Sequence, residues 1–207
     1  MNIYFKGTSE TGSFAITFDD GPHPHNTPKL LELLSNFNAR ATFFLTGKNA
    51  SKNKALVREV SQQGHLIGNH SLNHLKKIFL SPQELIFEIK TAKGILEDII
   101  SKPVTLYRPP YGFISPFLFS ICKKLDLKIV LWNLQTHDYR RENYPIIIKR
   151  TMKKIRAGSI ILFHEGHFNY TSLDYSNTID AVKFILKKSL SLKIKPATVN
   201  QVLEFKD

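Results

Sequence analysis

The chain has 207 residues, a hydrophobic fraction of 42% and a single cysteine. The length and apolar content suit one folded domain over residues 1–207 and argue against intrinsic disorder, while one cysteine excludes an intramolecular disulfide and a thiolate metal cluster. The net charge of +12 is spread over amphipathic segments without long basic runs, so it predicts a basic surface rather than a nucleic-acid-binding one.

Short apolar runs alternate with longer amphipathic stretches along the chain, which predicts strands that alternate with helices. Thr27 and Pro28 are a suitable N-cap and first helical residue, and Ser81 with Glu84 forms a capping box. The predicted strands are Ser13–Phe18, Ala41–Leu45, His65–Asn69, Val104–Tyr107, Lys128–Trp132, Ser159–Phe163 and Leu192–Ile194. The predicted helices are Thr27–Phe37, Lys52–Gln63, Ser81–Ile100, Pro116–Leu125, Pro145–Ile155 and Asn177–Ser189, with a short one after Pro196.

This order of elements predicts an α/β fold, because strands alternating with helices form βαβ units around a parallel sheet. About seven such units in a chain of this length favour a closed or nearly closed (β/α) barrel. An open doubly wound sheet is the alternative. It usually carries a glycine-rich phosphate loop after its first strand, and no such loop follows Ser13–Phe18.

Reactive side chains stand just after the predicted strands. The carboxyl ends of parallel barrel strands meet on one face, where such enzymes build their active sites. The opposite loops, such as 38–40 and 190–191, carry little reactive chemistry. We therefore expect one shared site. Its candidate residues are Asp19, Asp20, His70, His74, Arg108, Asp138 and His164.

Taken singly, these groups have ordinary explanations. His70 and His74 are four residues apart, which places both rings on one face if the segment is helical. Two imidazoles and a carboxylate form a frequent hydrolytic zinc site, but such histidine pairs also occur on plain surfaces. Asp19-Asp20-Gly21 suits a solvated turn, although a turn at a strand end also lets both carboxylates reach one pocket.

Five sequence blocks, however, occur together and in order: Thr17–Pro22, His70–His74, Arg108–Gly112, Trp132–Tyr139 and Ile160–His164. By these blocks the chain resembles the polysaccharide deacetylase (NodB homology) family, carbohydrate esterase family 4, from about Phe14 to about Glu204. The resemblance implies a distorted (β/α) barrel and a metal-dependent hydrolase that removes N-acetyl groups from N-acetylglucosamine-type sugars of peptidoglycan or a chitin-like glycan.

The resemblance also implies roles for the residues at the expected metal site. Asp20, His70 and His74 would bind a divalent metal, with Zn²⁺ expected and Co²⁺ or another divalent ion as the alternative. Bound metal would activate water and polarise the amide carbonyl. Asp19 would be the general base, oriented by Arg108, whose plainer interpretation is a surface ion pair.

Further roles follow from the same resemblance. His164 would be the general acid that protonates the leaving amine, with Asp138 hydrogen-bonded to it. The backbone N–H of Tyr111 would stabilise the oxyanion. The pocket for the acetyl group and sugar ring would be lined by Trp132, Leu162 and Tyr139, although plain core packing explains Trp132 equally well.

The chain departs from the family pattern at three positions. Gln135 and Tyr139 replace the usual Asp and Trp of the fourth block, and Glu165 replaces the usual Asp after His164. These exchanges leave the metal ligands and the base untouched and bear on the substrate and on the tuning of His164. The following loop, Gly166–Ser176, would either stack on sugar rings or be a plain surface loop; its aromatic and histidine residues are His167, Phe168, Tyr170 and Tyr175.

Other functions stay open at this stage. An amidohydrolase of a lipid-linked or small-molecule amide on the same fold is the main alternative, and an inactive carbohydrate-binding protein is another. No apolar run has the length of a membrane span, and Met1–Gly7 lacks the apolar core of a signal peptide. The protein is therefore expected to be either cytoplasmic or a trimmed extracytoplasmic form, and no pattern predicts its oligomeric state.

Overall fold

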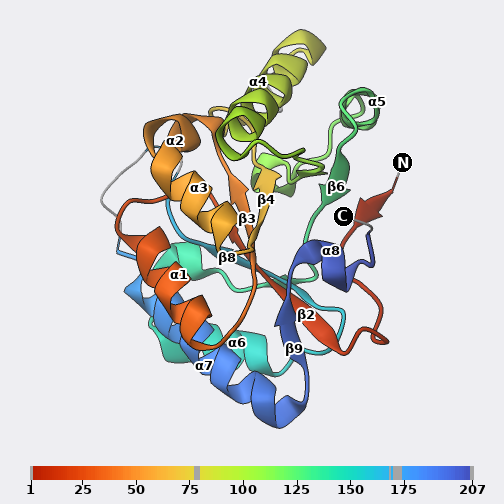
Figure 1. The fold of residues 1–207 in the computed structure, drawn as a ribbon. Coiled ribbons are helices and arrows are strands. Elements are labelled where there is room, and N and C mark those ends of the chain that lie inside the picture. Colours follow the sequence, from red (N-terminus) through yellow and green to blue (C-terminus); the bar gives the residue numbers. More distant parts are fainter. Residues whose placement is uncertain (1, 77–79, 168, 170–173, 206–207) are drawn as a thin grey trace.

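The computed structural model describes residues 2–76, 80–167, 169 and 174–205. It contains one parallel sheet surrounded by helices (Figure 1). The strands are β1 (Ile3–Tyr4), β2 (Ser13–Asp19), β3 (Thr42–Leu45), β4 (Leu66–Asn69), β5 (Leu106–Tyr107), β6 (Lys128–Val130), β7 (Leu134–Gln135), β8 (Ile160–His164) and β9 (Lys195–Ala197). The α-helices are α1 (Asn26–Asn36), α2 (Gly47–Lys52), α3 (Lys54–Gln62), α4 (Pro82–Ile100), α5 (Leu118–Lys124), α6 (Tyr144–Met152), α7 (Ser176–Leu192) and α8 (Val199–Val202).

The sheet is a distorted, incompletely closed barrel, which confirms the predicted fold class. Its strands follow the order β1-β6-β5-β4-β3-β2-β8-β7, with β9 beside β2. Every recorded strand pair is parallel. Within the described residues, no pairing joins β1 to β7 at the two ends of this order.

Strand β2 is buried along its whole length because both of its faces are covered. Phe14, Ile16 and Phe18 belong to the apolar layer shared with the surrounding helices. Ala15 belongs to a second cluster inside the barrel, to which α8 contributes Val199 and Val202. Since side chains alternate along a strand, the residues at 17 and 19 face the barrel interior, as Ala15 does.

Strand register brings the expected site residues to one end of the barrel. In the β2–β8 pair Asp19 lies opposite His164, and in the β4–β5 pair Asn69 lies opposite Tyr107. The residues that follow Asn69 and Tyr107 are His70 and Arg108. The parallel sheet therefore presents a carboxylate, imidazoles and a guanidinium at the same carboxyl edge.

The capping box predicted from the sequence is confirmed, because Ser81 and Glu84 form it at the start of α4. The single cysteine, Cys122, is buried. Tyr4 of β1 packs edge-on against Phe205, with 4.8 Å between ring centroids, so the two ends of the described chain lie together (Figure 1). Among the described residues, none of the helices has the length and hydropathy needed to cross a bilayer.

Other local expectations are wrong. The helix expected over Lys52–Gln63 is present as α3, but the preceding helix α2 was not expected; the Thr46 side chain caps the start of α2, and Asn53 separates α2 from α3. The strand expected at 192–194 begins only at residue 195, since α7 continues to residue 192 before Lys193 adopts a left-handed conformation. Strands β1 and β7 were not expected, because two residues are too few to show a period.

Thr27 does not cap α1, contrary to the prediction. The helix begins at Asn26, and the imidazole Nδ1 of His23 accepts the Asn26 backbone N–H at 3.3 Å. The Thr27 hydroxyl accepts the His23 backbone N–H at 2.8 Å and contacts the Glu165 carboxylate. The Thr27 hydroxyl therefore makes a tertiary contact with Glu165 and does not cap the helix.

Candidate active site

A pocket of about 490 Å³ opens at the carboxyl end of the sheet. Nine of the eleven predicted site residues line it, and the other two, Arg108 and Asp138, are buried in contact with lining residues. The predicted residues that line it are Asp19, Asp20, His70, His74, Tyr111, Trp132, Tyr139, Leu162 and His164.

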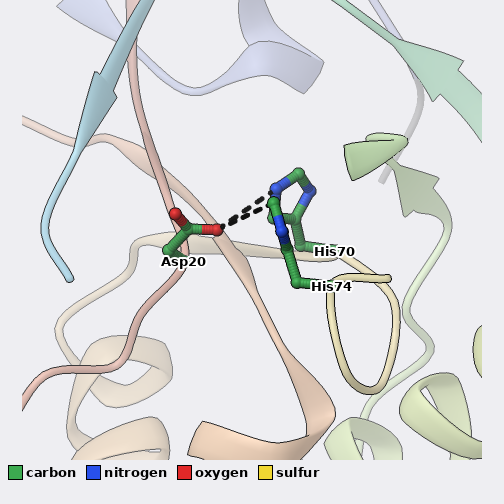
Figure 2. Close-up of side chains that lie close together, drawn as sticks. All are labelled: Asp20, His70 and His74. Carbon is green, nitrogen blue, oxygen red and sulfur yellow. Dashed lines mark ion pairs between the residues drawn. The ribbon is translucent and has the colours of Figure 1, made fainter. Parts of the chain in front are cut away.

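Asp20, His70 and His74 form a buried cluster in which one ligand atom of each residue lies within 4.8 Å of the others. Figure 2 shows the Asp20 carboxylate facing both rings. Its Oδ1 is 3.5 Å from the Nε2 of His70 and 3.2 Å from the Nε2 of His74. Two imidazole nitrogens and one carboxylate oxygen are the donor set of many hydrolytic zinc sites.

Hydrogen bonds around the cluster prepare it for a cation. The Nδ1 of His70 lies 2.7 Å from the backbone carbonyl of Arg108. Because a carbonyl only accepts, Nδ1 donates there and Nε2 keeps its lone pair facing Asp20, as in most metal-ligating histidines. On the other side, the Asn49 amide donates to the Asp20 backbone carbonyl at 2.7 Å.

The electrostatics of the cluster also fit a cation. Burial raises the pKa of Asp20 to about 7, and the Asp19 and Asp138 carboxylates add to this rise against the opposing effect of His164. Burial, with His70 close by, lowers the pKa of His74 to about 2, so its imidazole is neutral. The His164 charge offsets the burial of the Asp20 carboxylate only in part, and a divalent ion would supply further positive charge.

The segment carrying the two histidines is a loop and not the helix that would have aligned them. Ser71 and His74 have φ angles of 72° and 55°, a left-handed conformation that is uncommon for residues other than glycine. The rings still meet, with 4.9 Å between their centroids. Asp20 is also left-handed, at φ 72°, and this turn lets it and Asp19 reach the same pocket.

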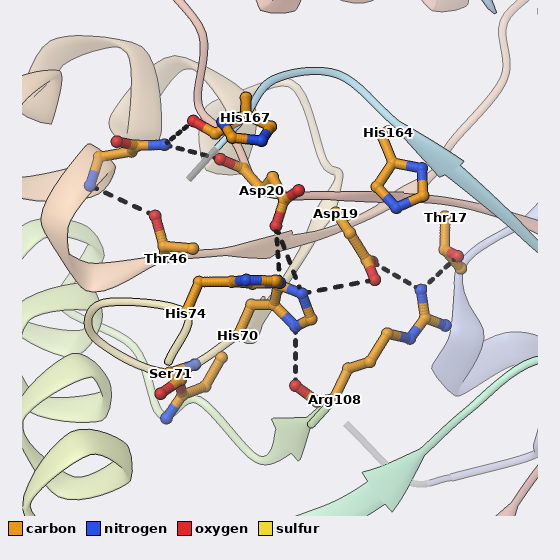
Figure 3. A network of polar contacts seen from close by, with 12 residues as sticks. Thr17, Asp19, Asp20, Thr46, His70, Ser71, His74, Arg108, His164 and His167 are labelled. Carbon is orange, nitrogen blue, oxygen red and sulfur yellow. Dashed lines mark hydrogen bonds and ion pairs between the residues drawn. The ribbon is translucent and has the colours of Figure 1, made fainter. Parts of the chain in front are cut away.

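Arg108, which is fully buried, holds the Asp19 carboxylate in place. Nη1 of Arg108 donates to Asp19 Oδ1 at 2.7 Å and to the Thr17 hydroxyl at 2.6 Å, as Figure 3 shows. Its Nε and Nη2 donate to the backbone carbonyls of Val130 and Leu131. Arg108 is thus a buried, hydrogen-bonded partner and not the surface ion pair of the plainer interpretation.

His164 forms the opposite side of the pocket. Its Nδ1 lies 2.8 Å from Asp138 Oδ1, and its backbone N–H donates to Asp138 Oδ2 at 2.7 Å. Thr136 and Thr178 donate their hydroxyls to the same carboxylate at 3.0 Å each. Burial lowers the pKa of His164, but Asp138, with Asp20 and Asp19, outweighs burial and raises it to about 9.

Aromatic rings form the rim of the pocket. The Tyr111 ring packs edge-on against His74, and the Tyr139 ring against His164. Trp132 is partly exposed and lines the pocket, so it is more than a core residue. Gly112 has φ 67°, and a side chain there would collide with the Trp132 ring.

The sequence matches known proteins along most of its length. The family model for polysaccharide deacetylase matches residues 6–130. The chain belongs to the polysaccharide deacetylase family. The relatives named below are deacetylases, which are hydrolases. A peptidoglycan-N-acetylglucosamine deacetylase from Bacillus cereus is 35% identical over 194 residues, which cover 93% of this chain and 88% of the relative.

Two further polysaccharide deacetylases extend the likeness. A chitooligosaccharide deacetylase from Azorhizobium caulinodans is 35% identical over 160 residues, covering 77% of this chain and 76% of the relative. A crystal structure of a peptidoglycan N-acetylglucosamine deacetylase in complex with 4-naphthalen-1-yl-N-oxidanyl-benzamide aligns with a TM-score of 0.91 at 28% identity. That alignment covers 99% of this chain and 94% of the other.

The structure also places the positions at which this deacetylase family member departs from the pattern. Gln135 lines the pocket. Glu165 is completely buried behind it, where its carboxylate contacts the Thr27 hydroxyl and occupies the space beside Gly21. Burial raises the pKa of Glu165 to about 8, so the neutral form is favoured. His167 and Tyr175 line the pocket, whereas Phe168 and Tyr170 lie outside the described residues.

Sequence reasoning missed several residues around the site. Arg141 lines the pocket but belongs to none of the five blocks. Thr17 is the first residue of a block without a predicted role of its own, although its hydroxyl accepts from Arg108 and donates to the Ile161 carbonyl at 2.7 Å. Thr178 and Glu88 lie on helices far along the chain from the groups they contact. A polar residue on an amphipathic helix carries no signal that distinguishes such a role.

Proposed function

We propose that this chain is a metal-dependent deacetylase that hydrolyses the acetamido group of N-acetylglucosamine-type sugars in a glycan, with residues 1–207 as a single catalytic domain. One observation carries the proposal. The Asp20, His70 and His74 cluster lies beside the buried Asp19 carboxylate on one side of the pocket, and His164, paired with Asp138, lies on the other side. The peptidoglycan and chitooligosaccharide deacetylases among the relatives support the substrate class.

Asp20, His70 and His74 hold the divalent ion in this proposal, and Zn²⁺ suits their mixed nitrogen and oxygen donors best, with Co²⁺ as an alternative. When bound, such an ion acts as a Lewis acid toward the amide carbonyl and makes water easier to deprotonate. The chain's own residues supply the remaining functions.

Asp19 is the general base that accepts the proton of the attacking water. Its Oδ2 is 3.7 Å from the His70 Nε2, so this oxygen faces the cluster while Arg108 holds Oδ1. Arg108 therefore fixes which carboxylate oxygen is available to the water. A base aimed in this way contributes orders of magnitude to the rate.

His164 is the general acid that protonates the departing sugar nitrogen. The Asp138 carboxylate accepts from Nδ1, which leaves the Nε2 proton available for transfer. Water adds to the carbonyl carbon, the C–N bond breaks, and acetate and a free amine result. The Tyr111 backbone N–H donates to the developing oxyanion. The acetyl group and sugar ring contact Trp132, Leu162 and Tyr139.

Acetate release tests the proposal. Purified, zinc-loaded protein is given N-acetylated chitooligosaccharides or peptidoglycan, with chelator-treated protein as the control. We expect release that stops on chelation, and the preferred polymer then defines the substrate. If metal-loaded protein releases no acetate from either polymer, the glycan assignment is wrong and lipid-linked or small-molecule amides become the substrates to test.

A matched variant separates an enzyme from an inactive carbohydrate-binding protein. His70→Ala should lose bound metal and acetate release together, because it removes one of three ligands. Sugar binding should persist, since His70 lies at the base of the site. Undiminished turnover by metal-free His70→Ala protein would refute metal-dependent catalysis.

A further inference from the structure

Glu88 is a buried carboxylate in the middle of α4 that faces the loop between His70 and His74. Only 3% of the Glu88 surface is exposed to solvent. Oε2 accepts the Ser71 hydroxyl and the Asn73 backbone N–H at 2.8 Å each, and Oε1 accepts the Asn73 side-chain amide at 2.7 Å. All three donors therefore belong to residues that lie between the two histidines in sequence.

This loop needs external support. Two of its five residues, Ser71 and His74, adopt left-handed conformations, each of which costs free energy for a non-glycine residue and persists only when its surroundings enforce it. From α2 the backbone N–H groups of Gly47 and Lys48 donate to the Ser71 and Leu72 carbonyls at 3.0 Å each. Glu88 adds its bonds from α4, so both helices clamp the loop.

Docking of α4 alone does not explain a carboxylate at this position. Leu85 and Ile89 on the same helix already pack in an apolar cluster with Tyr107. That packing gives no reason for a carboxylate at position 88. A buried carboxylate is costly unless it is hydrogen-bonded. Here both oxygens are satisfied, and every recorded bond goes to the histidine loop.

We propose that Glu88 is a positioning residue for metal binding, which through Ser71 and Asn73 holds the loop in the conformation that brings His70 and His74 together. The inference rests on the proposed function only in requiring that the cluster bind a divalent ion. Residues that orient metal ligands in this way commonly contribute about 10- to 100-fold to metal affinity.

The test compares Glu88→Gln with Glu97→Gln in the full chain. Glu97 is on the same helix and also accepts a backbone N–H, that of Val104 at 2.8 Å, but its recorded bonds lie away from the histidine loop. We expect Zn²⁺ affinity, measured by competition with a chromophoric chelator, to fall about 10- to 100-fold in Glu88→Gln and less than twofold in Glu97→Gln. The visible absorption of the Co²⁺-loaded protein should change only in Glu88→Gln.

A second variant guards against a general folding defect. Ser71→Ala removes one donor to Glu88 with little change in volume, so it should weaken Zn²⁺ binding by a smaller factor. Its effect should be less than additive with that of Glu88→Gln, because both act through one network. Equal Zn²⁺ affinity in Glu88→Gln and wild type, or fully additive effects, would overturn the proposal.

The outcome for Glu88 is separable from that for the enzyme. If wild-type protein binds Zn²⁺ but releases no acetate, the proposed reaction falls while the affinity comparison still decides the role of Glu88. If acetate is released and Glu88→Gln binds Zn²⁺ normally, the reaction stands and the positioning role falls. A wild-type chain that binds no divalent metal overturns both.

Discussion

The two sides of the pocket each hold a buried aspartate against a cation, but the two cations differ. On one side the Arg108 guanidinium bonds Asp19 at 2.7 Å. On the other side the His164 imidazole bonds Asp138 at 2.8 Å. A guanidinium stays charged at any working pH, whereas an imidazole gains or loses its proton within a few pH units.

This difference between the two cations matches the proposed roles of Asp19 as the general base and His164 as the general acid. Arg108 has no proton to give, so its effect on Asp19 is to fix the orientation of a carboxylate that accepts one. Asp138 instead stabilises a charge on His164 that is present only when the imidazole is protonated, so it keeps a proton ready for transfer.

Asp19→Asn removes the proton acceptor while keeping the shape of the side chain. We expect acetate release to fall by about 10²- to 10⁴-fold with metal content unchanged, because the three clustered ligands remain. The checks are kcat on a chitooligosaccharide and metal analysis of the purified protein. Asp98→Asn, an exposed exchange on α4, is the control, and activity near wild type in Asp19→Asn would exclude the base role.

Asp138→Asn removes the negative charge that is paired with His164. His164 is protonated below its pKa of about 9, so wild-type activity should decline as the pH rises through this value. Without the Asp138 charge the pKa should return toward 6.5, and a donor with that pKa is about 30-fold less protonated at pH 8. The pH profile of kcat/KM measures the shift, and an unchanged alkaline limb would rule out His164 as the proton donor.

Glu165 is a buried carboxylate that contacts the Thr27 hydroxyl, whereas Asp19 and Asp138 each contact a cation. Glu165→Gln tests what this difference does to its protonation. Burial raises its pKa from 4.5 to about 8, so the folded state holds the proton more tightly than the unfolded state. The stability this gives is greatest below pH 4.5 and is lost as the pH rises toward 8. Glu165→Gln should remove the dependence, which amounts to about 1.4 kcal/mol per pH unit.

The measurement for Glu165 is urea unfolding of metal-free protein between pH 5 and pH 8, so that metal release does not contribute. The difference in free energy of unfolding between variant and wild type should grow in favour of the variant as the pH rises. A constant difference would show that Glu165 does not titrate on folding.

Thr178→Val should give the smallest effect. It deletes one hydroxyl donor to Asp138 with almost no change in volume, and a buried hydrogen bond of this kind contributes about 1 kcal/mol to stability. Thr151→Val is the control, because that hydroxyl donates to the Ile147 carbonyl in its own helix. Thermal unfolding of both variants decides whether the Asp138 network depends on Thr178.

The sequence was most informative where chemistry follows a strand. Asp19, His70, Arg108 and His164 were expected to meet because parallel strands bring their carboxyl ends to one face, and they do meet at one pocket. The conformation of the His70–His74 loop was not predictable, since histidines four residues apart suit a helix equally well. Its clamp depends on Glu88, whose place on α4 resembles any other polar position of an amphipathic helix.

The β2–β8 register has a consequence for how the site responds to partial unfolding. Asp19 and His164 are register partners on the adjacent strands β2 and β8, so their separation is set by a ladder of backbone hydrogen bonds. Amide hydrogen exchange of Phe18 and Phe163 should therefore require global opening of the chain. In the loop from His70 to His74, the His70 backbone N–H still donates to the Leu45 carbonyl of β3 at 2.9 Å, but residues 71–74 belong to no described strand. They should therefore open at a lower free energy. Mild denaturant should then release metal well before it separates the two proton-transfer groups.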